Sequence, residues 1–278
     1  YKSFIDFSTD LIGPWAGYFV GWTYWLCWIT IGIADLSAII YYLQFFNNGM
    51  PFTPLEGVLI SVASIIFITG LNLATVKLFG EMEFWFAMIK IIAIVVLIAV
   101  GAWMIFTGFT STAGEVAAFS NLWSHGGMFP PGLGGFLAGF QIAIFAFVGV
   151  ELVGTTAAET KDPEKNLPKA VNSIPIRIII FYVLALVIVM AVTPWNKIDP
   201  SISPFVNLFS QAGIAAAAII MNLVVLSSVM SSMNSGVFST SRMLFGLSRD
   251  EQGPKSFGKL NNRAVPANAL YFSTVCLL

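Results

Sequence analysis

Two ionisable side chains stand inside apolar stretches of this 278-residue sequence, where a charge is costly and usually serves a function. Lys90 follows the apolar run 84–89 and precedes a longer one. A lysine held away from bulk water could exchange a proton during a conformational cycle. The alternative is a lysine whose side chain stretches to the cytoplasmic boundary, roughly 10 Å away. Proton exchange and boundary anchoring both stay open for Lys90.

Glu151 is the second such group, and it follows Gly149 closely in the apolar segment 133–157. An unpaired carboxylate at mid-membrane costs several kcal/mol or more, so packing alone explains it poorly. If the helix opens over 147–149, the freed backbone groups line a cavity for a small zwitterion, whose carboxylate meets the positive end of a half-helix. Alternatively, Gly149 only lets a neighbouring helix approach closely. The pairing of Gly149 with Glu151 favours the broken helix.

The polar side chains of the segment 212–240 are weaker candidates for the functional site. Ser231, Ser232 and Asn234 fall within one helical turn, and serines spaced three or four residues apart share a face. Such hydroxyls either help to coordinate an ion or return hydrogen bonds to the carbonyl four residues earlier. We treat Ser231, Ser232 and Asn234 as candidate supporting residues around the site. Asp35 in the first apolar segment carries no assignment of its own.

The elements that hold these residues are predicted to be membrane-spanning helices. Hydrophobic residues make up 57% of the chain and charged residues 10%, against roughly 25% charged in soluble domains. A net charge of −1 provides no basic field for nucleic acid. We therefore predict an all-α polytopic membrane protein, with residues 1–278 as a single transmembrane domain. The apolar segments long enough to span, the last of them cut short, are 14–46, 55–76, 83–107, 133–157, 174–194, 212–240 and 265–278.

The cations between these segments predict an orientation. Loops on one side carry most of the Lys and Arg residues, and of the loops on the other side only 195–211 carries one, Lys197. The positive-inside rule therefore places the N-terminal end of the chain in the cytoplasm. The cations assigned to the cytoplasmic side are Lys2, Lys77, Lys161, Lys165, Lys169, Arg177, Arg242, Arg249, Lys255, Lys259 and Arg263.

The sequence offers little support for enzymatic chemistry. His125 is the only histidine, so no His-Glu-x-x-His metal motif is possible, and no phosphate-cradling Gly-x-x-x-x-Gly-Lys loop occurs. We expect no metal site, no catalytic residues and no organic cofactor. A membrane enzyme is therefore the weakest interpretation.

Three stretches carry a family resemblance. Residues 72–91 resemble the junction of the fourth and fifth helices of bacterial amino acid permeases of the amino acid, polyamine and organocation superfamily. Residues 140–168 are similar to their sixth helix and the following cytoplasmic loop, and 234–245 to the end of their eighth helix. The resemblance extends over essentially the whole chain.

The resemblance implies part of the leucine-transporter fold, which has two inverted repeats of five helices. Here the chain would supply helices three to eight and the start of nine, so it looks like a fragment without helices one, two and ten to twelve. Lys90 matches a lysine that implies proton coupling, and Glu151 a carboxylate implicated in gating or protonation. The residues that match the unwound, substrate-contacting segment are Phe145, Ala146, Phe147 and Gly149.

The expected function is proton-coupled import of small neutral amino acids such as glycine, D-alanine and D-serine across a bacterial inner membrane. Protons would be the coupling ion, and the amino acid and the lipid bilayer the partners. One alternative is a permease for other amino acids, namely aromatic ones, 4-aminobutyrate or proline. Another is a non-transporting membrane sensor or scaffold that keeps the fold.

Overall fold

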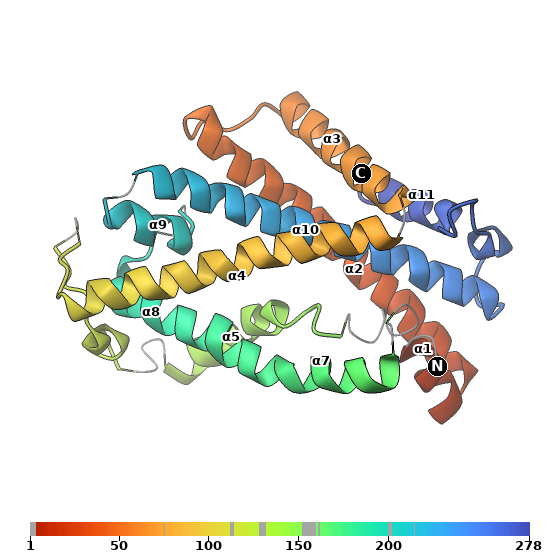
Figure 1. The fold of residues 1–278 in the computed structure, drawn as a ribbon, viewed down its shortest axis with the longest axis horizontal. Helices are drawn as coiled ribbons and strands as arrows, with labels where there is room; N and C mark the ends of the chain where they lie inside the picture. Colours follow the sequence, from red (N-terminus) through yellow and green to blue (C-terminus); the bar gives the residue numbers. More distant parts are fainter. Residues whose placement is uncertain are drawn as a thin grey trace. The chain divides into compact units, whose positions relative to one another are not determined.

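The prediction of an all-α fold is confirmed by a computed structural model, in which the described regular secondary structure is helical (Figure 1). One isolated β-bridge joins Thr110 and Val116. The described chain divides into two compact units. The residues that the structure describes are 4–74, 76–111, 114–127, 132–151, 160, 162–199, 202–213 and 215–278.

The first unit combines the N-terminal helices with the C-terminal part of the chain, from Val225 onward. Helix α4 (Val76–Phe106) contributes to it up to Met88, and α10 (Ala215–Arg249) from Val225. Its remaining elements are α1 (Phe4–Leu11), α2 (Pro14–Gln44), η1 (Phe45–Asn47), α3 (Pro54–Leu73), η6 (Lys255–Gly258) and α11 (Ala267–Val275).

Local sequence sets where these helices begin. Gly13 adopts φ +135°, which side chains rarely allow, and Pro14 occupies the first position of α2. At α3, the Thr53 hydroxyl accepts from the backbone N–H of Glu56, while the Glu56 carboxylate accepts from the backbone N–H of Thr53 at 2.8 Å. This reciprocal cap satisfies two helix-start donors that would otherwise lack partners.

Two clusters of apolar side chains form the core of the first unit. The larger joins α2, α3 and α10 to α11, and Ile68 and Leu270 are fully buried in it. The smaller joins α1 to the end of α10 through Ile5, Leu244 and Leu247. Because such packing fixes neighbouring helices, these clusters hold the polar side chains of α10 in place.

The second unit contains Ile89–Val153 and Thr160–Val224. Its core lies among α4, α8, α9 and the start of α10, with Leu97, Met104 and Val192 almost fully buried. Its elements besides the shared parts of α4 and α10 are η2 (Phe119–Leu122), α5 (Gly132–Ala146), α7 (Pro163–Ile178), the π-helix η4 (Ile179–Leu184), α8 (Ala185–Val192), η5 (Trp195–Lys197) and α9 (Pro204–Gln211).

Five helical stretches within the described residues are long and apolar enough to cross a membrane. The helix boundaries differ from the predicted ones in three places, one of which is the end of α10 at Arg249, beyond the predicted end at 240. Helix α5 ends at Ala146, well before the predicted end of its segment, and the next stretch begins at Pro163, within the predicted loop. The five stretches are Pro14–Asn47, Pro54–Leu73, Gly80–Phe106, Pro163–Val192 and Ile219–Arg249.

Large apolar side chains cover the outside of these helices. Leu55 is 69% exposed and Phe106 82% exposed. In water such a surface would be strongly unfavourable, whereas lipid solvates it and leaves only the backbone to be satisfied internally by helices. The chain is therefore a multi-pass membrane protein.

Candidate functional site

A connected set of polar side chains from three helices lies in the first unit. On α10, Ser231 and Asn234 each donate a 2.8 Å hydrogen bond to the carboxylate of Glu83 on α4, Ser231 to Oε2 and Asn234 to Oε1. The side-chain amide of Asn72 on α3 donates to Asn234 Oδ1, also at 2.8 Å. Asn234 is 0% exposed, Ser231 1% and Asn72 6%. We call these four residues the Glu83 cluster.

A second polar contact joins α10 to α2. Ser232 hydrogen-bonds with the carboxylate of Asp35. Asp35 Oδ2 and Asn72 Oδ1 are both buried, with no hydrogen-bond partner among the described residues. Buried acceptors without partners are uncommon in folded proteins. Each of these two oxygens could accept a further hydrogen bond.

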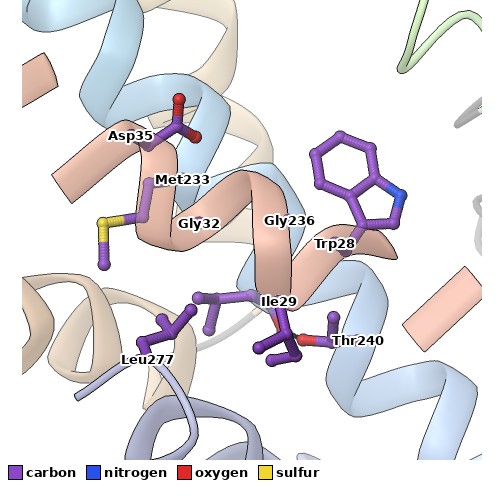
Figure 2. A pocket seen from close by; sticks show the side chains of 9 residues that line it. Trp28, Ile29, Gly32, Asp35, Met233, Gly236, Thr240 and Leu277 are labelled. Atoms are coloured by element: carbon purple, nitrogen blue, oxygen red, sulfur yellow. Dashed lines mark hydrogen bonds between the residues drawn. The ribbon is translucent and has the colours of Figure 1, made fainter. Parts of the chain in front are cut away.

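Asp35 also lines a small pocket between α2 and α10 (Figure 2). Figure 2 shows Asp35 and Trp28 on the same helix, α2, and Leu277 on the segment that follows α11. The space open to the centre of a water molecule is about 10 Å³, which is room for about one water and too little for an amino acid. The lining residues are Trp28, Ile29, Gly32, Asp35, Met233, Gly236, Val237, Thr240 and Leu277.

The second unit contains the other group of predicted site residues, just beyond the end of α5. The helix ends at Ala146, one residue before the segment in which the sequence predicts an opening. Residues 147–151 form turns, and Gly149 adopts φ +99°, a conformation that side chains rarely allow. The backbone N–H of Gly149 donates a 2.9 Å hydrogen bond to the exposed carboxylate of Glu151. The Glu151 carboxylate thereby accepts a hydrogen bond from a backbone N–H that lies beyond the end of the helix.

Phe147 fixes the start of this turn against a neighbouring helical stretch. Its ring stacks on that of Tyr182, with centroids 5.6 Å apart and planes 12° apart. Tyr182 lies in the π-helix Ile179–Leu184, where the wider turn replaces the regular α-helical bonding. Such π-segments inside helices occur frequently at functional sites.

The structure therefore separates the predicted site residues into groups. It joins Ser231 and Asn234 to Glu83, but Ser232 to Asp35. Phe147, Gly149 and Glu151 share the turn after α5, in the other unit. Ala146 ends α5 with an exposed side chain, and the side chain of Phe145 is outside the described part. Lys90 is half-buried on α4, seven residues after Glu83.

Sequence reasoning did not assign Glu83 or Asn72 to the site. Glu83 lies at the edge of a predicted span, where a carboxylate is unremarkable. One available signal was its spacing of seven residues from Lys90, which places both on one face of a helix. Asn72 offered no local signal, because its partner Asn234 is 162 residues away.

The chemistry available here is binding and proton exchange. Among the described residues, no group of three His, Cys, Asp or Glu side chains could hold a metal ion. The turn at 147–151 instead offers backbone amides and carbonyls beside a carboxylate, which suits a ligand carrying both an ammonium and a carboxylate group.

Comparison with known proteins gives a consistent picture. The family model described as amino acid permease matches residues 1–278. The D-serine/D-alanine/glycine transporter of Escherichia coli (strain K12) is 62% identical over all of this chain, which covers 58% of that protein. The amino-acid permease AapA of Bacillus subtilis (strain 168) is 50% identical, again over the whole chain, and 59% of it is covered.

A more distant relative has another specificity in its name. The aromatic amino acid transport protein AroP of Escherichia coli O6:H1 is 40% identical over 98% of this chain, which covers 58% of that protein. The chain thus spans less than two thirds of the length of each of these relatives. The names of these relatives describe transporters and permeases, not enzymes.

Proposed function

The chain belongs to the amino acid permease family, and from that premise we propose that the protein carries amino acids across a membrane. The observation that carries the proposal is the 62% identity, over every residue of the chain, to a protein named as a D-serine/D-alanine/glycine transporter. The proposal extends this likeness to the substrates that the relative's name gives. Glycine, D-alanine and D-serine are therefore the proposed substrates.

The turn after α5 is the proposed contact with the amino acid. Ala146 and Phe147 lead into it, and the positive φ of Gly149 holds peptide groups outside regular helical bonding. Peptide groups freed in this way can bind the charged ends of a small zwitterion. The proposed substrates have short side chains, so their ammonium and carboxylate groups are the main features that the protein can bind.

Proton coupling is proposed to involve Lys90 and Glu151. Lys90 lies within the apolar span Gly80–Phe106, and Glu151 beside the proposed substrate contact. A membrane-embedded lysine whose charge changes through the cycle would link proton movement to the two conformations of the carrier. The proposed location is a bacterial inner membrane, with the N-terminal end of this chain in the cytoplasm because the cations gather on that side.

Uptake into liposomes tests this function. The full-length protein containing this chain is reconstituted, and uptake of labelled glycine or D-serine is measured with and without an imposed pH gradient. We expect the gradient to accelerate uptake in the wild type and to have no effect in Lys90→Ala. Lys197→Ala is the matched control, since Lys197 lies outside the spans and should keep the response. Gradient-insensitive uptake by the wild type would remove the proton role.

A second candidate substrate class is aromatic amino acids, which the 40% identity to AroP favours. Competition separates the two classes. Unlabelled D-alanine should displace labelled glycine, whereas phenylalanine and tryptophan should not. The reverse pattern would favour the aromatic class over small neutral amino acids.

A further inference from the structure

The hydrogen bonds that link the four residues of the Glu83 cluster to one another all point toward the carboxylate. Asn72 donates to Asn234, Asn234 donates to Glu83 Oε1, and Ser231 donates to Glu83 Oε2. An ionised carboxylate only accepts hydrogen bonds, so the orientation of Asn234, and through it that of Asn72, follows from the charge on Glu83. The cluster is thus arranged around an ionised acid.

A proton on Glu83 would disrupt this order. If the proton is on Oε1, two donors face each other: the O–H of Glu83 and the side-chain amide of Asn234. On Oε2 the Ser231 hydroxyl could rotate and accept, but Asn234 would then face a neutral acceptor, and hydrogen bonds to a neutral group are roughly half as strong. Asn72 Oδ1 cannot relieve the conflict without giving up the bond that the Asn72 amide makes to the carbonyl of Ile68.

Among the described residues, charged groups near the cluster come from α4, α10, α2 and the loop after η6. Lys90 lies two turns along α4 from Glu83, on the same face. On α10, the Arg242 guanidinium lies 3.2 Å from the centroid of the Phe238 ring and donates to the Phe238 carbonyl. Asp35 faces α10 from α2 through Ser232. Beyond α3, Arg263 donates to the carbonyl of Leu73, next to Asn72.

We propose that Glu83 is a proton-operated latch. When ionised, its carboxylate holds α4 to α10 and, through Asn234, to α3; when a proton from water adds to one of its oxygens, Asn234 is released and α10 loosens. Glu83 is a positioning residue in this scheme, and nothing in it requires contact with a transported molecule. The latch stands apart from the proposed function, and only its effect on uptake rests on that function.

Hydrogen–deuterium exchange on the full-length protein in lipid nanodiscs tests the latch directly. In the wild type, α10 peptides that contain Ser231 and Asn234 should exchange on the order of tenfold faster in the acid range where a carboxyl group takes up a proton than at neutral pH, after correction for intrinsic rates. Glu83→Gln should exchange fast at both pH values. Glu81→Gln is the matched control, because Glu81 is an exposed carboxylate on the same helix, and it should behave as the wild type.

A further variant covers the case in which Glu83→Gln does not insert. Ser231→Ala removes one donor to the ionised carboxylate, so these α10 peptides should exchange faster than in the wild type at neutral pH. The proposal is overturned if the wild type shows no pH response in these peptides, if Glu83→Gln keeps the wild-type response, or if Ser231→Ala exchanges like the wild type at neutral pH.

Uptake adds a second readout. In liposomes, Glu83→Gln should lower the maximal rate of glycine uptake several-fold and leave KM unchanged, because the latch affects helix movement and not substrate contact. A changed KM with an unchanged rate would contradict this. Absence of any amino acid uptake by the wild type would count against the proposed function alone, since the exchange data would still decide on the latch.

Discussion

The ring of Phe147 stacks on that of Tyr182, which lies on a π-helical turn of a different helical stretch. This contact ties the turn after α5 to the segment Ile179–Leu184. Removing the ring in Tyr182→Ala should free the turn, and an aromatic pair of this kind contributes about 0.5–1.5 kcal/mol. We expect KM for glycine uptake to rise about two- to tenfold, while Tyr182→Phe, which keeps the ring, stays near the wild type. Equal effects of both variants would contradict a role for the stack.

Gly149 provides a second prediction, since its φ of +99° disfavours any side chain. Gly149→Ala should cost about 1–2 kcal/mol at the turn and lower kcat/KM for uptake by roughly five- to thirtyfold. Gly139→Ala is the matched control, because a Cβ at Gly139 on α5 meets nothing within 4 Å. Comparable loss of uptake in both variants would show that an added methyl group is harmful on α5 as well as in the turn after it, whatever the backbone conformation.

Gly236 allows close contact between α2 and α10. A Cβ at this position would lie 2.7 Å from Cε3 of the Trp28 ring, closer than any normal contact. Gly236→Val should therefore destabilise the first unit by about 1–3 kcal/mol, seen as a lower thermal unfolding midpoint in detergent. Gly246→Ala on the same helix meets nothing within 4 Å and should keep the midpoint. Combining Gly236→Val with Trp28→Leu should recover part of the loss.

Asn121 anchors the loop before α5. Its side-chain amide donates to the carbonyls of Val116 and Ala191, at 2.9 and 2.8 Å, and the residue is 7% exposed. Asn121→Ala removes this donor from both carbonyls, of which that of Ala191 belongs to a fully buried residue, and should cost about 1–3 kcal/mol. Hydrogen exchange of the loop should accelerate, whereas the exposed neighbour in Ser120→Ala should have no effect. Unchanged exchange in Asn121→Ala would mean that water replaces both bonds freely.

The sequence predicts the parts of this molecule that depend on local composition. Long unbroken apolar runs predict helices, because in a membrane only a helix satisfies all backbone groups within a single segment. Lys90 and Glu151 stand out since a charge within an apolar run is rare. Helix α7 is not predicted in this way, because its first turns are polar and hydropathy assigns them to a loop. Pro163 at its start is nevertheless a normal helix-starting residue.

Contacts between distant residues could not be predicted in the same way. Asn72 and Asn234 each look like an ordinary polar residue in a helix, and only folding brings their side chains to 2.8 Å. Glu83 sits at the end of a span, where solvation makes a carboxylate inexpensive, so its sequence position gives no hint of two buried donors. The candidate site could therefore be predicted where it is local to one segment, but not where three helices build it.

The π-helix Ile179–Leu184 has a consequence for the stretch Pro163–Val192 as a whole. A π-turn accommodates one extra residue, which rotates everything beyond it by about 100° around the helix axis. Residues of α7 and α8 whose spacing would place them on one face of a regular α-helix therefore point in different directions. Deleting one residue from this segment would bring the two halves into phase and turn the side chains that α8 packs inward, such as Ile188 and Val192, toward lipid.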